Sequence, residues 1–160
     1  MMFRLILFFY IFYSYQALGF EFACNFEEVY SNSEVQQGVF LIKDDMLRYQ
    51  YYDQDLFTII AKNNKYFLIN NISKTVQRIN EKTEALDILM DIISDFPELD
   101  SVYKRNDLII KLEKSSDEFI KRISINSKEA NLSINMINCR YDEIEKKYFR
   151  HFNFEEYPEQ

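Results

Sequence analysis

Residues 38–51 read GVFLIKDDMLRYQY, and this stretch decides which kind of sheet the chain can form. Successive side chains of a β-strand point to opposite faces, so residues 39 and 41 would lie on one face and residues 40 and 42 on the other. All four are large and apolar: Val39, Phe40, Leu41 and Ile42. After a polar break at 43–45, Met46 lies on one face, and Leu47, Tyr49 and Tyr51 lie on the other. A strand with one solvated face alternates apolar and polar residues, so both faces of these strands need a cover.

The composition fits one folded domain. The chain has 160 residues, of which 48% are hydrophobic and 17% aromatic, so it can bury a core. The formal net charge is −7, and no run of Lys or Arg forms a basic stripe, which argues against nucleic-acid binding. We expect a single domain over residues 20–160.

Residues 1–19 differ from the rest of the chain. Arg4 precedes an uncharged apolar run over residues 5–15, and Ala17 and Gly19 form the small-x-small pattern that signal peptidase reads. This predicts a secretory signal peptide over residues 1–19, a mature chain that starts at Phe20, and an exported protein. The alternative is an uncleaved N-terminal anchor, although eleven apolar residues are few for a membrane span. A lipid anchor on Cys24 is less consistent with the sequence, because Glu21 and Phe22 are not the small aliphatic residues that precede a lipidated cysteine.

Strand patterns dominate residues 20–154. We expect strands at 20–30, 36–43, 46–53, 56–61, 65–70, 74–79, 107–113, 119–126, 132–141 and 146–154. Asp44-Asp45, Asn63-Asn64 and Asn71 are the predicted turns, since Asn tolerates left-handed backbone where Gly is absent. These short spacings predict a meander of antiparallel hairpins.

One segment has helical periodicity. Leu86, Leu89, Ile93 and Phe96 repeat at helical spacing, and acidic residues occupy the opposite face. Thr83 is the predicted N-cap and Pro97 the stop. We expect a helix over 83–96 that lies across the concave side of the sheet.

The predicted fold class is therefore mostly β (α+β): a curved antiparallel sheet, or incomplete β-barrel, with one amphipathic helix packed on its concave side. A helix of about fourteen residues is about 20 Å long and cannot cover a whole curved sheet. A closed barrel or a sandwich would bury the remaining apolar surface. The other possibility is a cavity kept for an apolar guest.

The order of these elements resembles the LolA family, the periplasmic carriers that ferry lipoproteins between the two membranes of Gram-negative bacteria. The family pattern has a strand beginning G-x-f-x-i-x-R-P, an aromatic strand, two hairpin strands and a Thr-led helix. This sequence has GVFLIKDDMLRYQYYDQDLFTIIAKNNKYFLIN and TEALDIL at corresponding places, and the match covers residues 36–90. Residues 119–154 fit the closing strands more loosely and end in the family's F-x-F, at Phe152 and Phe154.

The resemblance implies a non-catalytic carrier with a hydrophobic cavity for acyl chains. The residues expected to line that cavity are Phe40, Ile42, Tyr49, Tyr51, Phe57, Ile59, Phe67, Leu86, Leu89, Met90, Ile93 and Phe96. Lys43 occupies the position of the family arginine that helps to hold the helical lid. The implied partners are a lipoprotein or lipid cargo, an inner-membrane release complex and an outer-membrane acceptor. We expect a monomer with no cofactor and no metal.

The sequence departs from the family at three places. The family's Arg-Pro falls on Lys43-Asp44, the proline at the helix start is Glu84, and the long helix before the first strand is missing. The two cysteines, Cys24 and Cys139, form an even set in an exported chain, which predicts one disulfide with Cα atoms about 4.4–6.8 Å apart. Such a bond would tie the first strand to a late one and compensate for the missing helix.

Other functions have weaker support in the sequence. An envelope adaptor or assembly factor would use the same fold to bind a protein, for example by strand addition at a sheet edge. A small hydrolase would need a nucleophile and a carboxylate beside His151, the only histidine, and no such pattern is present. We interpret His151 as a surface or rim residue, and the acidic pairs as solvated turns because none has the calcium-loop form.

Overall fold

The structure is a computed structural model that describes residues 21–80, 84–95, 98–116, 119–128, 131–153 and 155–158, without the side chains of residues 85 and 93. Its strands are β1 Glu21–Tyr30, β2 Val35–Lys43, β3 Met46–Tyr51, β4 Phe57–Lys62, β5 Lys65–Asn70, β6 Val76–Ile79, β7 Val102–Arg105, β8 Leu108–Lys114, β9 Ile120–Asn126 and β10 Asn131–Arg140. The helices are α2 Glu84–Asp95 and a single 3-10 turn, η1 Lys146–Phe149.

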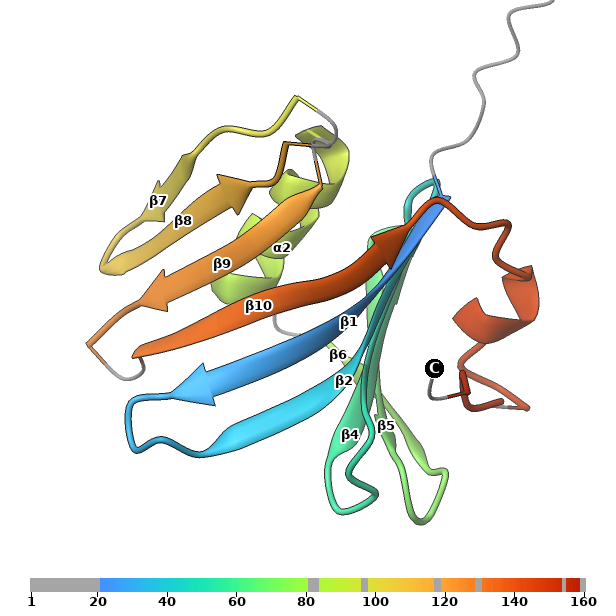
Figure 1. Cartoon of the computed structure of the whole chain (residues 1–160). Helices are drawn as coiled ribbons and strands as arrows, with labels where there is room; N and C mark the ends of the chain where they lie inside the picture. Colours follow the sequence, from blue (N-terminus) through green and yellow to red (C-terminus); the bar gives the residue numbers. More distant parts are fainter. Residues whose placement is uncertain are drawn as a thin grey trace, which may run out of the picture.

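All ten strands belong to one antiparallel sheet in the order β6-β5-β4-β3-β2-β1-β10-β9-β8-β7. The sheet is open, because its end strands β6 and β7 pair only with β5 and β8. Figure 1 shows the strong bend of the sheet, with α2 on one side and η1 on the other. The predicted mostly-β class with one short helix is confirmed.

Most predicted strands lie close to the observed ones. The strand expected at 65–70 is β5, and it follows the predicted turn at Asn63-Asn64, where both residues have positive φ, 50° and 56°. Two positive φ angles are what a two-residue hairpin turn requires.

Two expectations about strands were wrong. Strand β7 was not predicted, and residues 146–154 do not form a strand, since 146–149 are η1 and 150–153 are irregular.

In residues 38–51, the two alternating sets of side chains lie on opposite faces of the sheet, as predicted. Phe40, Ile42, Leu47, Tyr49 and Tyr51 belong to one large core, which also contains α2. The opposite face of the same two strands buries a second cluster, which includes Val39, Leu41 and Met46. We call the side of the sheet that packs against α2 the concave face and the other side the convex face.

The C-terminal segment, residues 141–153 and 155–158, covers the convex face of β1–β3. Its Ile144, Phe149 and Tyr157 complete the second cluster, and Phe149 is fully buried. This segment is the second cover that the opening stretch requires. The strand pattern at 146–154 was misleading because Tyr148 and Phe149 pack onto a sheet face instead of belonging to a strand at an edge.

Arg48 and Gln50 of β3 fasten this segment. Arg48 is fully buried and donates hydrogen bonds to the carbonyl oxygens of Tyr148 (2.6 Å) and Glu155 (2.8 Å), and its Nε donates to Gln50 Oε1 (2.8 Å). Gln50 Oε1 also accepts from the Tyr157 N–H at 3.1 Å, and Gln50 Nε2 donates to the Tyr157 carbonyl at 3.2 Å. Burial lowers the pKa of Arg48 to about 10, so the guanidinium is still charged at neutral pH.

Gly38 allows a close approach in the concave core. A Cβ atom at this position would lie 2.4 Å from the Phe26 ring and 2.0 Å from the Gln50 carbonyl oxygen. The Phe26 ring therefore fills the space beside Gly38 and stacks on Tyr49, with ring centroids 4.1 Å apart. This explains why one of only two glycines in the chain lies inside a strand.

The predicted disulfide joins Cys24 of β1 to Cys139 of β10, with Cα atoms 4.1 Å apart, just below the expected range. The β1–β10 register shifts by one residue here: Ala23 pairs with Arg140, whereas Asn25 pairs with Ile137. The extra residue is a β-bulge, and Asn138 within it has a φ of 53°. Without this bulge Cys139 would point to the convex face, away from Cys24.

Several expectations lie outside the described residues. These are the signal peptide at 1–19 and the mature start at Phe20, the N-cap Thr83, the helix end at Phe96 and Pro97, and Phe154. In the part of the chain that the structure describes, no helix combines the length and apolar character needed to cross a membrane.

Candidate functional site

An apolar cavity of about 210 Å³ lies between α2 and the concave face. It is lined by Glu28 of β1 and otherwise by aliphatic and aromatic side chains from strands in both halves of the sheet and from α2. The lining residues are Glu28, Phe40, Tyr49, Tyr51, Phe57, Ile59, Leu86, Leu89, Ile92, Ile110, Ile123, Ile125 and Ile134. The bend of the sheet lets strands from both of its halves reach the same cavity. In a flat sheet, strands so far apart could not all lie close to a single helix.

The structure brings seven of the twelve predicted cavity residues together here: Phe40, Tyr49, Tyr51, Phe57, Ile59, Leu86 and Leu89. Ile42 and Met90 belong to or pack against the same core without lining the cavity. Phe67 does not belong here, since it lies in a separate cluster with Ile60 and Ile69 on the convex face. The side chain of Ile93 and all of Phe96 lie outside the description.

The helix faces the cavity slightly differently from the prediction. Among the described side chains of the helix, Ile88 and Ile92 are the most deeply buried, at 2% and 1% exposure, whereas Leu89 is only half-buried. Neither Ile88 nor Ile92 belongs to the predicted stripe of Leu86, Leu89, Ile93 and Phe96.

Glu28 is the polar feature of the cavity, and sequence reasoning missed it. Its carboxylate is buried and accepts hydrogen bonds from three tyrosine hydroxyls: Tyr49 (2.5 Å), Tyr51 (2.7 Å) and Tyr30 (2.7 Å). Three donors compensate for the water that a buried carboxylate loses. A sequence signal was present, because Glu28 has the same strand parity as Phe22, Cys24 and Phe26.

Burial, followed by the charge and hydrogen bonds of Glu28, raises the pKa of Tyr49 and Tyr51. The pKa of Tyr30 is also raised by burial and by Glu28. The three phenols therefore remain protonated donors throughout the neutral range. One wall of the cavity thus carries a buried carboxyl group that accepts from three tyrosine hydroxyls, while the other described lining residues are apolar or aromatic.

The outer edge of α2 is fastened by polar contacts to β7. The Arg105 guanidinium lies 3.0 Å from Asp87 and 2.9 Å from Asp91, and the Tyr103 hydroxyl donates to Asp95 at 2.9 Å. Burial and then the hydrogen bond to Asp95 raise the pKa of Tyr103 to about 12. The three aspartates recur every four residues along the helix. We call this set of contacts the β7 latch. The sequence placed these aspartates on a solvated face because β7 itself was not predicted.

Lys43 lies on the convex face, not beside α2. Its Nζ forms an ion pair with Glu21 Oε1 at 2.5 Å, and Glu21 Oε2 accepts from the Ile144 N–H at 2.8 Å. Burial alone would raise the pKa of Glu21, but the hydrogen bonds from Lys43 and Ile144 outweigh it and lower the pKa. In this structure Lys43 therefore helps to hold the C-terminal segment instead of contacting the helical lid.

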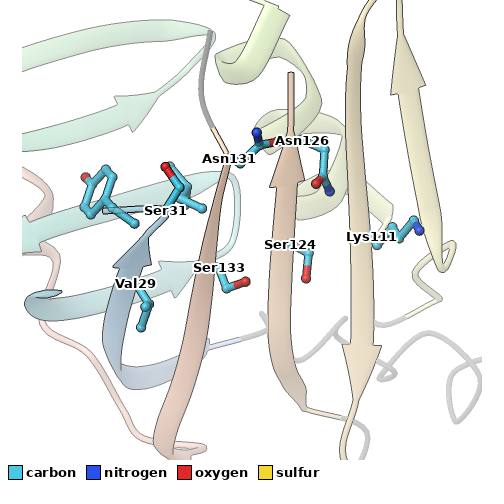
Figure 2. Close-up of a pocket in the computed structure, with 9 residues that line it drawn as sticks. Val29, Ser31, Lys111, Ser124, Asn126, Asn131 and Ser133 are labelled. Atoms are coloured by element: carbon cyan, nitrogen blue, oxygen red, sulfur yellow. The ribbon is translucent and has the colours of Figure 1, made fainter. Parts of the chain in front are cut away.

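A second hollow, of about 480 Å³, opens on the convex face of the other half of the sheet. Figure 2 shows its side chains in a row across neighbouring strands, with Val29, Ser133, Ser124 and Lys111 on β1, β10, β9 and β8. Small polar groups dominate this row, and Tyr30 is the only aromatic residue among the described ones that line the hollow. It offers hydrogen bonds to water but little apolar surface, so it is a poorer candidate than the concave cavity.

Among the described residues, no group of three or more His, Cys, Asp or Glu side chains is placed to hold a metal ion. His151 is partly buried and stacks flat on Phe67, with ring centroids 3.8 Å apart. Its position at the rim of a surface pocket fits the interpretation as a rim residue.

Comparison with known proteins leaves the family open. No protein-family model matches the sequence, and no curated protein matches it either. The LolA-like resemblance therefore remains a hypothesis that depends on the order of elements.

Proposed function

We propose that the protein is a non-catalytic carrier that holds the acyl chains of a lipoprotein, or of another lipid, in the concave cavity and passes them towards the outer membrane. The observation that carries this proposal is the cavity of about 210 Å³ under α2, with aliphatic and aromatic walls. Each methylene group that moves from water into such a space gains about 0.8 kcal/mol.

The cavity accepts a first stretch of an acyl chain, and larger cargo requires α2 to move. Apolar cavities of about 150 Å³ already bind benzene, so the observed space suits a few carbon atoms. In this proposal the bent sheet acts as an incomplete barrel, and α2 is the lid over its open side. The β7 latch supports a movable lid, because its ion pairs are partly exposed and such pairs contribute at most about 1 kcal/mol.

The sheet edges favour a carrier over an adaptor that binds a partner strand. The end strands β6 (Val76–Ile79) and β7 (Val102–Arg105) each have four residues. Such short edges give an added strand few backbone groups to pair with. The concave cavity therefore offers a ligand more contact than these short edges offer a partner strand.

A tryptophan reporter tests the proposal directly, because the chain contains no tryptophan. Phe57→Trp places the only indole at the cavity wall, whereas Ile72→Trp places it on a 63% exposed position in the turn after β5. A fatty acid brominated along its chain quenches an indole that it contacts. We expect saturable quenching of the Phe57→Trp protein and none above background for Ile72→Trp.

Mass spectrometry of lipid that co-purifies with the unmodified protein identifies the cargo. Equal quenching of the two reporters, or no quenching of either together with lipid-free protein, would refute the carrier proposal.

A further inference from the structure

We propose that the convex face carries a binding site for a phosphate-bearing anion, in a basic pocket between the β4–β5 turn, β6 and the C-terminal segment. The pocket has a volume of about 480 Å³. Its charged and titratable lining residues are Lys62, Lys65, Arg78, Lys146, Arg150 and His151. This site does not depend on the carrier proposal, because it lies on the opposite face of the sheet from the cavity.

The sheet register gathers the first three cations. Lys62 and Lys65 pair across the two-residue turn between β4 and β5, and Arg78 of β6 pairs with Phe67 of β5. Paired residues lie on the same face of a sheet, so all three cations lie on the convex face with Phe67.

The C-terminal segment supplies the remaining groups. Residues 146–152 are held at this place by the stack of His151 on Phe67 and by the hydrogen bond from Arg48 to the Tyr148 carbonyl. Residues more than sixty positions apart in the sequence therefore form one wall, which no local sequence motif could reveal.

The charges in this pocket are not neutralised within the described structure. Among the described residues, no Asp or Glu lines the pocket, although the chain as a whole has a net charge of −7. In the same part of the chain that the structure describes, no ion pair is found for Lys62, Lys65, Arg78 or Arg150. The charge of Lys146 helps to lower the pKa of Glu21. A cluster of cations without counter-ions attracts a multivalent anion.

The side chains favour a phosphate group over a carboxylate. Arg78 and Arg150 each offer a planar fork of donors that matches two phosphate oxygens, and the lysines add point charges. A phosphate monoester carries nearly two negative charges at neutral pH, whereas a carboxylate carries one. Phe67 and the 59% exposed Phe152 also line the pocket, and they offer an apolar contact to the rest of the molecule that bears the phosphate group.

His151 provides a built-in readout, because it is the only histidine of the chain. Burial, followed by the charges of Lys62 and Lys65, lowers its pKa. An anion in the pocket screens these charges and favours the protonated imidazole, so it raises that pKa. Proton NMR of the His151 ring in the full chain, titrated with pH in inorganic phosphate and in chloride of equal ionic strength, measures the effect.

We expect the pKa of His151 to be higher in phosphate than in chloride. Arg78→Gln/Arg150→Gln removes both guanidinium groups from exposed positions and should weaken the apparent phosphate affinity by about tenfold or more. The matched control is Lys111→Gln/Arg122→Gln, which removes two cations from the convex face of β8 and β9. The control should bind phosphate as the unmodified protein does.

Co-sedimentation with vesicles distinguishes the sources of the phosphate. Vesicles that contain phosphatidic acid, whose headgroup is a phosphate monoester, are compared with phosphatidylcholine vesicles for the same three proteins. Binding to phosphatidic acid that only the Arg78→Gln/Arg150→Gln protein loses assigns the site to a lipid headgroup, and a phosphate effect without vesicle binding assigns it to a soluble anion. Two results would overturn the proposal: no difference between phosphate and chloride together with no vesicle binding, or effects of equal size in the two double variants.

Discussion

The concave and convex faces of the same sheet are covered in two different ways. On the convex face, the C-terminal segment is fastened by a fully buried guanidinium that donates to two backbone carbonyls, and it leaves Phe149 without exposure. On the concave face, α2 is fastened by partly exposed ion pairs and leaves a cavity of about 210 Å³. Buried hydrogen-bonded charges are costly to separate and exposed pairs are not, so we expect the concave cover to move more readily than the convex one, as the carrier proposal requires.

The disulfide is the test with the largest expected effect. Cys24→Ser/Cys139→Ser removes the covalent link between β1 and β10, which joins residues 115 positions apart in the sequence. The chain-entropy model gives a loss of stability of up to about 5 kcal/mol for a loop of this length. Urea unfolding of the oxidised protein and of the double variant measures the difference. A loss below about 1 kcal/mol would show that the β1–β10 pairing needs no cross-link.

Arg48→Met tests the convex cover. The substitution keeps most of the side-chain volume but leaves the carbonyls of Tyr148 and Glu155 without their donor. We expect a loss of about 3 kcal/mol, since each unsatisfied buried acceptor costs about 1–3 kcal/mol. Urea unfolding gives the stability, and limited proteolysis at residues 141–158 reports release of the segment. Unchanged stability would mean that apolar packing alone holds this cover.

The alkaline limit of stability tests the tyrosine cluster around Glu28. An unfolded tyrosine ionises near pH 10, but burial and Glu28 raise the pKa of folded Tyr49 above that value. The unfolded state then binds fewer protons above pH 10, so stability falls as pH rises, by about 1.4 kcal/mol per pH unit for each such tyrosine.

Tyr49→Phe should therefore make this decline less steep by about that amount, when unfolding is followed between pH 9 and about pH 11.5. Tyr52→Phe is the control, because its hydroxyl bonds Asn25 and not Glu28. Parallel curves for the unmodified and Tyr49→Phe proteins would contradict the predicted protonation of the cluster.

The smallest effect on stability is expected at the β7 latch. Arg105→Gln removes the partner of Asp87 and Asp91, and these partly exposed pairs are worth less than about 1 kcal/mol. We nevertheless expect faster entry of a hydrophobic probe into the cavity, in stopped-flow fluorescence, because the lid opens more often. Added salt should speed entry into the unmodified protein and leave Arg105→Gln little changed. Lys128→Gln, which breaks a distant exposed pair with Asp107, should behave like the unmodified protein.

Strand periodicity predicted much of the sheet and one wall of the site. The double alternation in residues 38–51 placed Phe40, Tyr49 and Tyr51 on the face that lines the cavity. The cysteine count predicted the disulfide, but the bulge at Asn138 that aligns it has no sequence pattern beyond an asparagine.

Long-range arrangement set the limit of prediction. Residues 146–154 have the aromatic pattern of a strand, and only the need to cover the convex face explains why Tyr148 and Phe149 pack onto it instead. Arg48 was the overlooked signal, because a cation inside an apolar strand requires buried acceptors that come from elsewhere in the chain. The far walls of the cavity, from Ile110 to Ile134, depend on how sharply the sheet bends, which strand periodicity does not encode.

The position of β1 in the sheet has a consequence for biosynthesis. The first described strand, β1, lies at the centre of the sheet, between β2 and β10, and its convex cover includes Tyr157. While the chain is being made, β1 to β6 emerge as a meander with one unpaired central edge, and this edge waits for more than a hundred residues before β10 arrives. Such an exposed edge is prone to pair with the wrong chain. Delivery of the chain in an extended state, with folding only after the last strand has emerged, would protect it.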